Sequence, residues 1–95
     1  MLTPKNKALL KGLANHLKPQ INIGKGEIDE NMVTQISNSL EAHELIKIKV
    51  LQNSNEACED IANEIVSKTG SDLVDIIGRT IILYKPSKKK PRIIL

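Results

Sequence analysis

The stretch NIGKGEID, residues 22–29, holds the residues of this chain that are best suited to bind phosphate. Gly24 and Gly26 flank Lys25, and the loop joins a short apolar run to an acidic segment that begins a helix. At such a junction the free backbone N–H groups and the helix dipole attract an anion. Glycine permits close approach of a phosphate backbone, and Lys25 adds a positive charge. Taken alone, however, the motif favours a simple turn, because it is neither a Walker loop nor a GxGxxG fingerprint.

The sequence gives little support to catalysis. His16 lies near the end of a predicted helix and His43 near the start of a predicted strand, and neither has metal-ligand spacing to cysteine or carboxylates. Capping or hydrogen-bonding roles are favoured for both. Cys58 has no CxxC partner and no electropositive neighbour in sequence, which favours a buried structural thiol. We therefore expect no enzymatic activity, no cofactor and no metal.

Charge is segregated along the chain. Residues 1–26 and 79–95 together hold eleven basic residues and no acid, whereas residues 27–78 hold all eleven acids and three lysines. If the two ends meet in the fold, one face is positive and the other negative, a pattern that favours a polyanionic partner over a merely solubilising role. Tyr84 is the only aromatic residue, so binding by stacking bases on aromatic platforms is excluded as the main mode. Nucleic acid would be held mainly through phosphate.

Length and composition indicate one cytoplasmic domain. The chain has 95 residues, of which 40% are hydrophobic, and this is enough for one modest core. No signal peptide is recognisable, and no run of about 18 apolar residues could span a membrane. The single cysteine fits a reducing compartment.

The first predicted helix begins at Thr3, a good N-cap, with Pro4 at the first helical position. It ends before Pro19. At 100° per residue its apolar side holds Leu9, Leu10, Leu13 and Leu17, which we expect to face the core, and another side presents Lys7 and Lys11.

The remaining elements alternate strand and helix. A short strand over QINI precedes the glycine loop, and a helix capped by Asp29 or a neighbour runs to about Ala42. The alternation in HELIKIKVL predicts a half-buried strand with Ile46, Ile48 and Val50 inward and its lysines outward. A third helix, capped by Ser54 or Asn55, ends at Gly70.

Two final strands, DLVDII and TIILYK, are separated by Gly78 and Arg79, as in a type II′ hairpin. The whole order, αβαβαββ, predicts an α/β (α+β two-layer) domain with a four-stranded mixed sheet and the helices packed on it. We place this domain at residues 1–86. Residues 87–95 form a basic tail, whose basic part we expect to be mobile.

Four motifs in order are similar to those of a known family. They are the L-x-x-L-A-x-x-L-x-P opening, the glycine loop, the H-E-L-I-K strand and the V-x-x-I-G-x-x-x-x-L-Y-[RK] ending. From about Leu2 to Lys88 the chain resembles the CRM domain, for chloroplast RNA splicing and ribosome maturation, in its stand-alone YhbY-like form. The resemblance implies a non-enzymatic RNA-binding domain, similar in fold to the C-terminal domain of translation initiation factor three with an extra helix in front.

The resemblance also implies that RNA contacts centre on a KH-like GxxG loop, and here the chain departs from the family. Gly24 takes the first glycine position, but Glu27 stands where the second glycine is expected. A carboxylate there would oppose phosphate if it faced the loop, although it suits the helix dipole. Lys85 stands where arginine is common, which keeps the charge but removes bidentate phosphate contact.

We therefore predict an RNA-binding protein of ribosome biogenesis that binds the precursor of large-subunit ribosomal RNA, acts as a monomer and does not bind membranes. The alternative is a protein-interaction module that docks on a ribosomal protein or assembly factor through its acidic middle segment. The predicted RNA contacts are the glycine loop and the basic residues around it: Gly24, Lys25, Gly26, Lys7, Lys11, Lys18, Arg79, Lys85, Lys88, Lys89 and Lys90.

Overall fold

The fold is a four-stranded mixed sheet with three helices, as the sequence predicts. The structure, a computed structural model, describes residues 2–24, 28–51, 58–89, 91 and 93. Its elements follow in the order α1 (Pro4–Ala14), β1 (Ile21–Ile23), α2 (Glu30–His43), β2 (Leu45–Val50), α3 (Cys58–Thr69), β3 (Asp72–Ile77) and β4 (Thr80–Tyr84).

The strands lie in the spatial order β1-β2-β4-β3. The short β1 runs parallel to β2, and β4 is antiparallel to both β2 and β3. Side chains alternate between the two faces of a sheet. The central strands β2 and β4 therefore send every second residue to each side. Strand β4 has buried apolar residues on both sides, whereas β2 is apolar toward one side and carries Leu45, Lys47 and Lys49 on the other.

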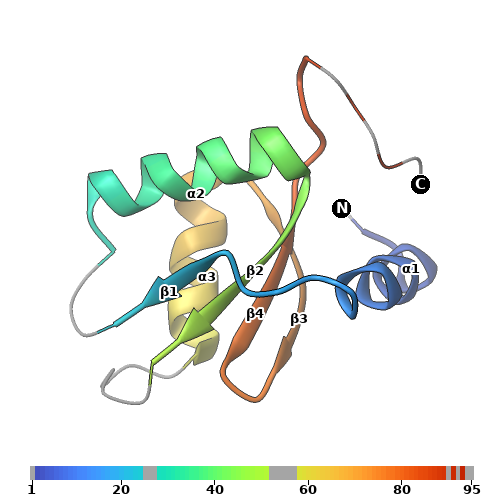
Figure 1. The fold of residues 1–95 in the computed structure, drawn as a ribbon, viewed down its shortest axis with the longest axis horizontal. Helices are drawn as coiled ribbons and strands as arrows, with labels where there is room; N and C mark the ends of the chain where they lie inside the picture. Colours follow the sequence, from blue (N-terminus) through green and yellow to red (C-terminus); the bar gives the residue numbers. More distant parts are fainter. Residues whose placement is uncertain (1, 25–27, 52–57, 90, 92, 94–95) are drawn as a thin grey trace.

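The two faces are covered by different helices (Figure 1). On one face α2 and α3 enclose the larger core, in which Ile48, Ile65 and Ile81 are fully buried. On the other face α1 packs Leu10 and Ala14 against a second cluster that includes Leu45, Val74, Ile82 and Tyr84. Two apolar faces on one central sheet explain why a chain this small needs a helix on each side.

Local signals set most element ends. The Thr3 side chain accepts a hydrogen bond from the Asn6 N–H at 3.1 Å, and Asp29 Oδ1 accepts one from the Met32 N–H at 2.8 Å. Both predicted N-caps are thus confirmed. Gly70 ends α3 with a φ of 72°, and Gly78 begins the β3–β4 turn with a φ of 60°. Left-handed φ angles of this kind favour glycine. The predicted cap of α3 lies outside the described residues.

Helix α1 differs from its prediction in the face that it buries. Leu10 and Ala14 are buried, whereas Leu9 is 48% and Leu13 42% exposed. Leu10 and Ala14 are four residues apart, so they form one narrow stripe along α1, and this stripe packs against the second cluster. Leu17 is half-buried against the same cluster. The prediction that all four leucines face the core is therefore wrong for Leu9 and Leu13.

The start of the tail packs against the end of α2. Ser87 is buried, and its N–H donates to Glu44 Oε2 at 2.8 Å. The Ile93 N–H donates to Glu44 Oε1, also at 2.8 Å. Glu44 itself is fully buried and has a φ of 64°. In its described part the tail makes these hydrogen bonds to Glu44, and the mobility of its basic part stays a prediction.

The two ends of the chain lie on the same side of the sheet. Leu2 and Ile93 both pack against the cluster beneath α1. The sequence predicts a positive face if the two basic ends of the chain meet in the fold, and in the described part of the chain they do. In that part, no helix is long and apolar enough to cross a membrane.

Candidate nucleic-acid interface

The side of the sheet that carries α1 is rich in lysine. Lys47 and Lys49 alternate with buried isoleucine and valine on β2, and they point to the same side as Leu45, which α1 covers. Lys49 pairs with Asn22 of β1 and with Thr80 of β4 in the sheet register, and it is exposed. The sequence predicts that both lysines point outward, but they are not among the predicted RNA contacts. The alternation in IKIKV was the signal for including them.

Lysines of α1 stand over the same face. Lys11 forms an ion pair with Asp75 of β3, with Nζ 2.8 Å from Oδ2. Lys7 lies close to the same carboxylate and contributes to its electrostatic surroundings. Beyond the end of α1, Lys18 is exposed, and the neighbouring Leu17 carbonyl accepts a hydrogen bond from Lys47 Nζ at 3.0 Å.

The glycine loop leaves the sheet at the end where the β3–β4 turn lies. The Leu51 N–H donates to the Ile23 carbonyl, and the Val50 N–H donates to the Arg79 carbonyl, both at 2.8 Å. These bonds bring Gly24 and Arg79 to the same end of the sheet. Lys25 and Gly26, at the centre of the predicted site, lie outside the described residues.

The remaining predicted residues lie at the opposite end. The strand from Thr80 to Lys85 spans about 17 Å, at about 3.4 Å per residue. Lys88 and Lys89 follow beyond it, and the Lys88 N–H donates to Glu41 Oε1 at 3.1 Å. The structure therefore divides the predicted site into two ends of one sheet. Lys90 lies outside the described residues.

Lys85 has a structural partner. It is half-buried, and its Nζ donates to the Thr69 carbonyl at 2.8 Å, at the C-terminal end of α3. A cation at this position satisfies a free carbonyl and interacts favourably with the helix dipole. Gly70 lies beside it, and a Cβ on Gly70 would be 3.7 Å from the ammonium. The geometry assigns Lys85 to capping α3 rather than to the exposed basic surface.

The acids of the described helices all lie on the other layer. Helix α1 contains three lysines and no acid, whereas α2 and α3 contain one lysine, Lys68, against five acids: Glu30, Glu41, Glu59, Asp60 and Glu64. The charge segregation seen along the chain thus becomes a difference between the two sides of the sheet. A polyanion approaching the α1 side meets the lysines first.

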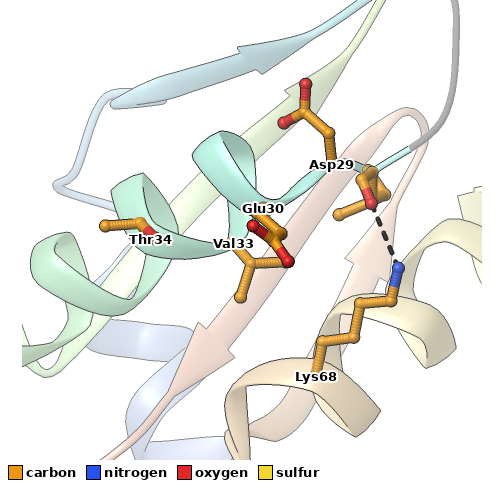
Figure 2. Close-up of a pocket in the computed structure, with 6 residues that line it drawn as sticks. Asp29, Glu30, Val33, Thr34 and Lys68 are labelled. Atoms are coloured by element: carbon orange, nitrogen blue, oxygen red, sulfur yellow. Dashed lines mark hydrogen bonds between the residues drawn. The ribbon is translucent and has the colours of Figure 1, made fainter.

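A pocket lies in the acidic layer, at the start of α2 (Figure 2). Its volume is about 700 Å³, and it lies between the first turns of α2 and Lys68 of α3. Lys68 Nζ donates to the Ile28 carbonyl at 3.1 Å and to Glu64 Oε2 at 2.8 Å. Asp29 caps α2. Because Lys68 and Asp29 hold helix ends in place, the pocket does not present an evident acid–base pair.

Among the described residues, Asp75, Glu41 and Tyr84 have shifted pKa values with clear causes. The hydrogen bond from Lys11, and then the Ile76 N–H, lower the pKa of Asp75. Hydrogen bonds from Ser87 and then from the Lys88 N–H lower the pKa of Glu41. Burial, followed by the negative charge of Glu44, raises the pKa of Tyr84. All three shifts keep these groups in their usual charge state at neutral pH.

The residues considered for catalysis are scattered. His16 and His43 are exposed, and Cys58, predicted to be a buried structural thiol, is a free thiol that is half-buried against the larger core. Within the described residues, no three histidine, cysteine or carboxylate side chains are grouped to hold a metal ion.

Comparison with known proteins agrees with the fold and with the resemblance seen in the sequence. Residues 2–85 match the model of the CRS1/YhbY (CRM) domain family. The chain is 48% identical to the "Probable RNA-binding protein YqeI" of Bacillus subtilis, over 98% of this chain and 97% of that protein. It is 41% identical to a Haemophilus influenzae protein named "RNA-binding protein", over 93% of this chain and 89% of that one.

A solved structure has the same fold. The solution structure of the hypothetical protein SAV1595 from Staphylococcus aureus matches with a TM-score of 0.83 and 44% sequence identity. The match covers 100% of this chain and 99% of that one.

Proposed function

Since this chain belongs to the CRS1/YhbY (CRM) domain family, we propose that it is an RNA-binding protein without enzymatic activity. The observation that carries the proposal is the concentration of lysines on the α1 side of the sheet, opposite an acidic layer. RNA lies across that side and is held through its phosphates. The two relatives named above as RNA-binding proteins support the same partner.

The contact surface centres on the end of the sheet where the glycine loop leaves it. Gly24, Lys25 and Gly26 admit a phosphate backbone, and Lys49 and Arg79 neutralise phosphates beside them. The surface continues along α1 through Lys7, Lys11 and Lys18. Lys88, Lys89 and Lys90 form a second, supplementary contact at the other end. Lys47, beside Lys49, adds charge to the middle of the face.

Salt dependence tests this mechanism. Contact with about four to six phosphates gives a slope on the order of −3 to −5 for log affinity against log salt concentration. The measurement is fluorescence anisotropy of a labelled RNA hairpin titrated at several KCl concentrations. An affinity that stays constant from low to high salt would contradict phosphate-dominated binding.

The proposed target is the precursor of large-subunit ribosomal RNA, bound in the cytoplasm by a monomer. In a gradient of cell extract, the protein should sediment with large-subunit precursors, and nuclease should release it. Purified precursor RNA should then bind the purified protein directly. Association that survives complete RNA digestion would instead indicate docking on a ribosomal protein through the acidic layer.

A further inference from the structure

Two acids of β3, Asp72 and Asp75, lie on the basic face, and in the described part of the chain Asp75 is the one that forms an ion pair with a lysine there. Asp75 lies on β3 opposite Ile82 of β4, which belongs to the cluster beneath α1, so its side chain is on the α1 side of the sheet. Its Oδ2 is 2.8 Å from Lys11 Nζ, and its Oδ1 accepts a hydrogen bond from the Ile76 N–H at 2.8 Å. Both oxygens thus have partners, and these hold the carboxylate against the lysine.

This ion pair is accessible to a competing anion. The side chain of Lys11 is 50% exposed and that of Asp75 is 35% exposed. Exposed ion pairs contribute only about 0–1 kcal/mol, because water and salt screen them. A phosphate that reaches Lys11 can therefore replace the carboxylate, but it must first overcome the repulsion from Asp75.

The pair also differs in kind from the other described ion pair. Lys68 and Glu64 are four residues apart on α3 and lie in the acidic layer, where Lys68 also holds the Ile28 carbonyl. Lys11 and Asp75 join two elements, and they do so on the lysine-rich side. Asp75 therefore lowers the positive charge of the surface where RNA is proposed to bind.

We propose that Asp75 limits RNA affinity by holding Lys11 in an ion pair that a phosphate must displace. The proposal rests on the RNA-binding function proposed above and deepens it. In the free protein Asp75 takes the position of a phosphate on Lys11. A phosphate that reaches Lys11 therefore gains little, because the contact that it makes is offset by the contact that Asp75 loses, and Lys11 adds no net phosphate contact while Asp75 is charged.

Asp75→Asn tests the proposal with little change in shape, because the amide oxygen can still accept the Ile76 N–H. We expect the affinity for a synthetic RNA hairpin at low salt to rise about threefold to tenfold, as one more lysine becomes available to phosphate. The slope of log affinity against log salt should become steeper by about 0.7 to 0.9, the change expected for one additional phosphate contact.

Asp72→Asn is the matched control. It makes the same change of charge on the same strand, and Asp72 lies opposite Tyr84, nearer the tail. It should raise affinity less than about twofold and leave the slope unchanged, because no described ion pair is broken.

Three results would contradict the proposal or the proposed function, and each has a different meaning. Equal gains for the two variants would mean that only net charge matters, and this would overturn the proposal. A loss of both affinity and thermal stability in Asp75→Asn would also overturn it, because Asp75 would then serve to position α1. If neither the wild type nor either variant binds RNA, the proposed function itself fails.

In a Lys11→Met background, Asp75→Asn should no longer steepen the slope of log affinity against log salt concentration, because the lysine that Asp75 pairs with is absent.

Discussion

Replacing Lys49 and Arg79 together by glutamate is expected to lower RNA affinity on the order of 1000-fold at low salt. Two attractions to phosphate of roughly 1 kcal/mol each become repulsions of similar size. Both residues are exposed and lie at the glycine-loop end of the sheet. Thermal stability should change little, since exposed substitutions of this kind usually alter stability by about 0.5 kcal/mol or less. Anisotropy titration and a thermal melt measure the two quantities.

Lys88→Glu with Lys89→Glu is the control for net charge. It changes the formal charge by the same amount, at exposed positions near the other end of the sheet. If the main contact lies at the glycine-loop end, the control should lose about tenfold or less at the same salt concentration. Equal losses in the two double variants would show that RNA responds to the charge of the whole protein rather than to a defined surface.

The second large effect concerns stability, and it depends on Glu44. Glu44→Ala should lower the free energy of unfolding by about 3 kcal/mol, because a hydrogen bond to a charged group contributes about 1.5–3 kcal/mol and the N–H groups left behind lose their acceptor. In the described part of the chain, those groups include the N–H groups of Ser87, which is buried, and of Ile93. Urea denaturation at neutral pH, followed by circular dichroism, measures the loss.

Two further variants give the measurement its controls. Glu44→Gln keeps one oxygen acceptor but turns an amide N–H toward the other donor, so it should fall between wild type and Glu44→Ala. Glu41→Ala removes contacts to the same tail from a more exposed position on α2, and it should cost much less. If Glu44→Ala unfolds at the same urea concentration as the wild type, the carboxylate is not what holds the tail.

The sequence predicts those parts of the fold that depend on neighbouring residues. Thr3 and Asp29 begin their helices because each side chain reaches an N–H three residues ahead. Gly70 and Gly78 take left-handed conformations that other residues resist. The alternation in IKIKV fixes which side chains of β2 enter the larger core.

What the sequence could not predict depends on residues far apart in the chain. The choice of Leu10 and Ala14 over Leu9 and Leu13 follows from how α1 meets Leu45 and Ile82. The bonds from the tail to Glu44 join residues more than forty positions apart. The spacing of residues in the sequence does not indicate which distant residues will contact each other in the fold.

The sequence predicts that the candidate site is basic, but it does not predict where in the fold each basic residue lies. Clustered lysines in the sequence do become one side of the sheet. Arg79 and Lys85, however, lie near opposite ends of the extended strand β4, so residues close in sequence are distant in space. Lys85 also binds the Thr69 carbonyl, and Lys11 binds Asp75. Counting basic residues overestimates how many lysines are available to RNA.

The opposed layers also have a kinetic consequence. With three lysines in α1 on one side of the sheet and a net acidic pair of helices on the other, the molecule has an electric dipole moment across the sheet. In the field of an RNA, such a molecule turns its lysine side forward before contact, so a larger share of collisions is productive. Added salt would then act first on the association rate, while the lifetime of the bound complex depends on the contacts made afterwards.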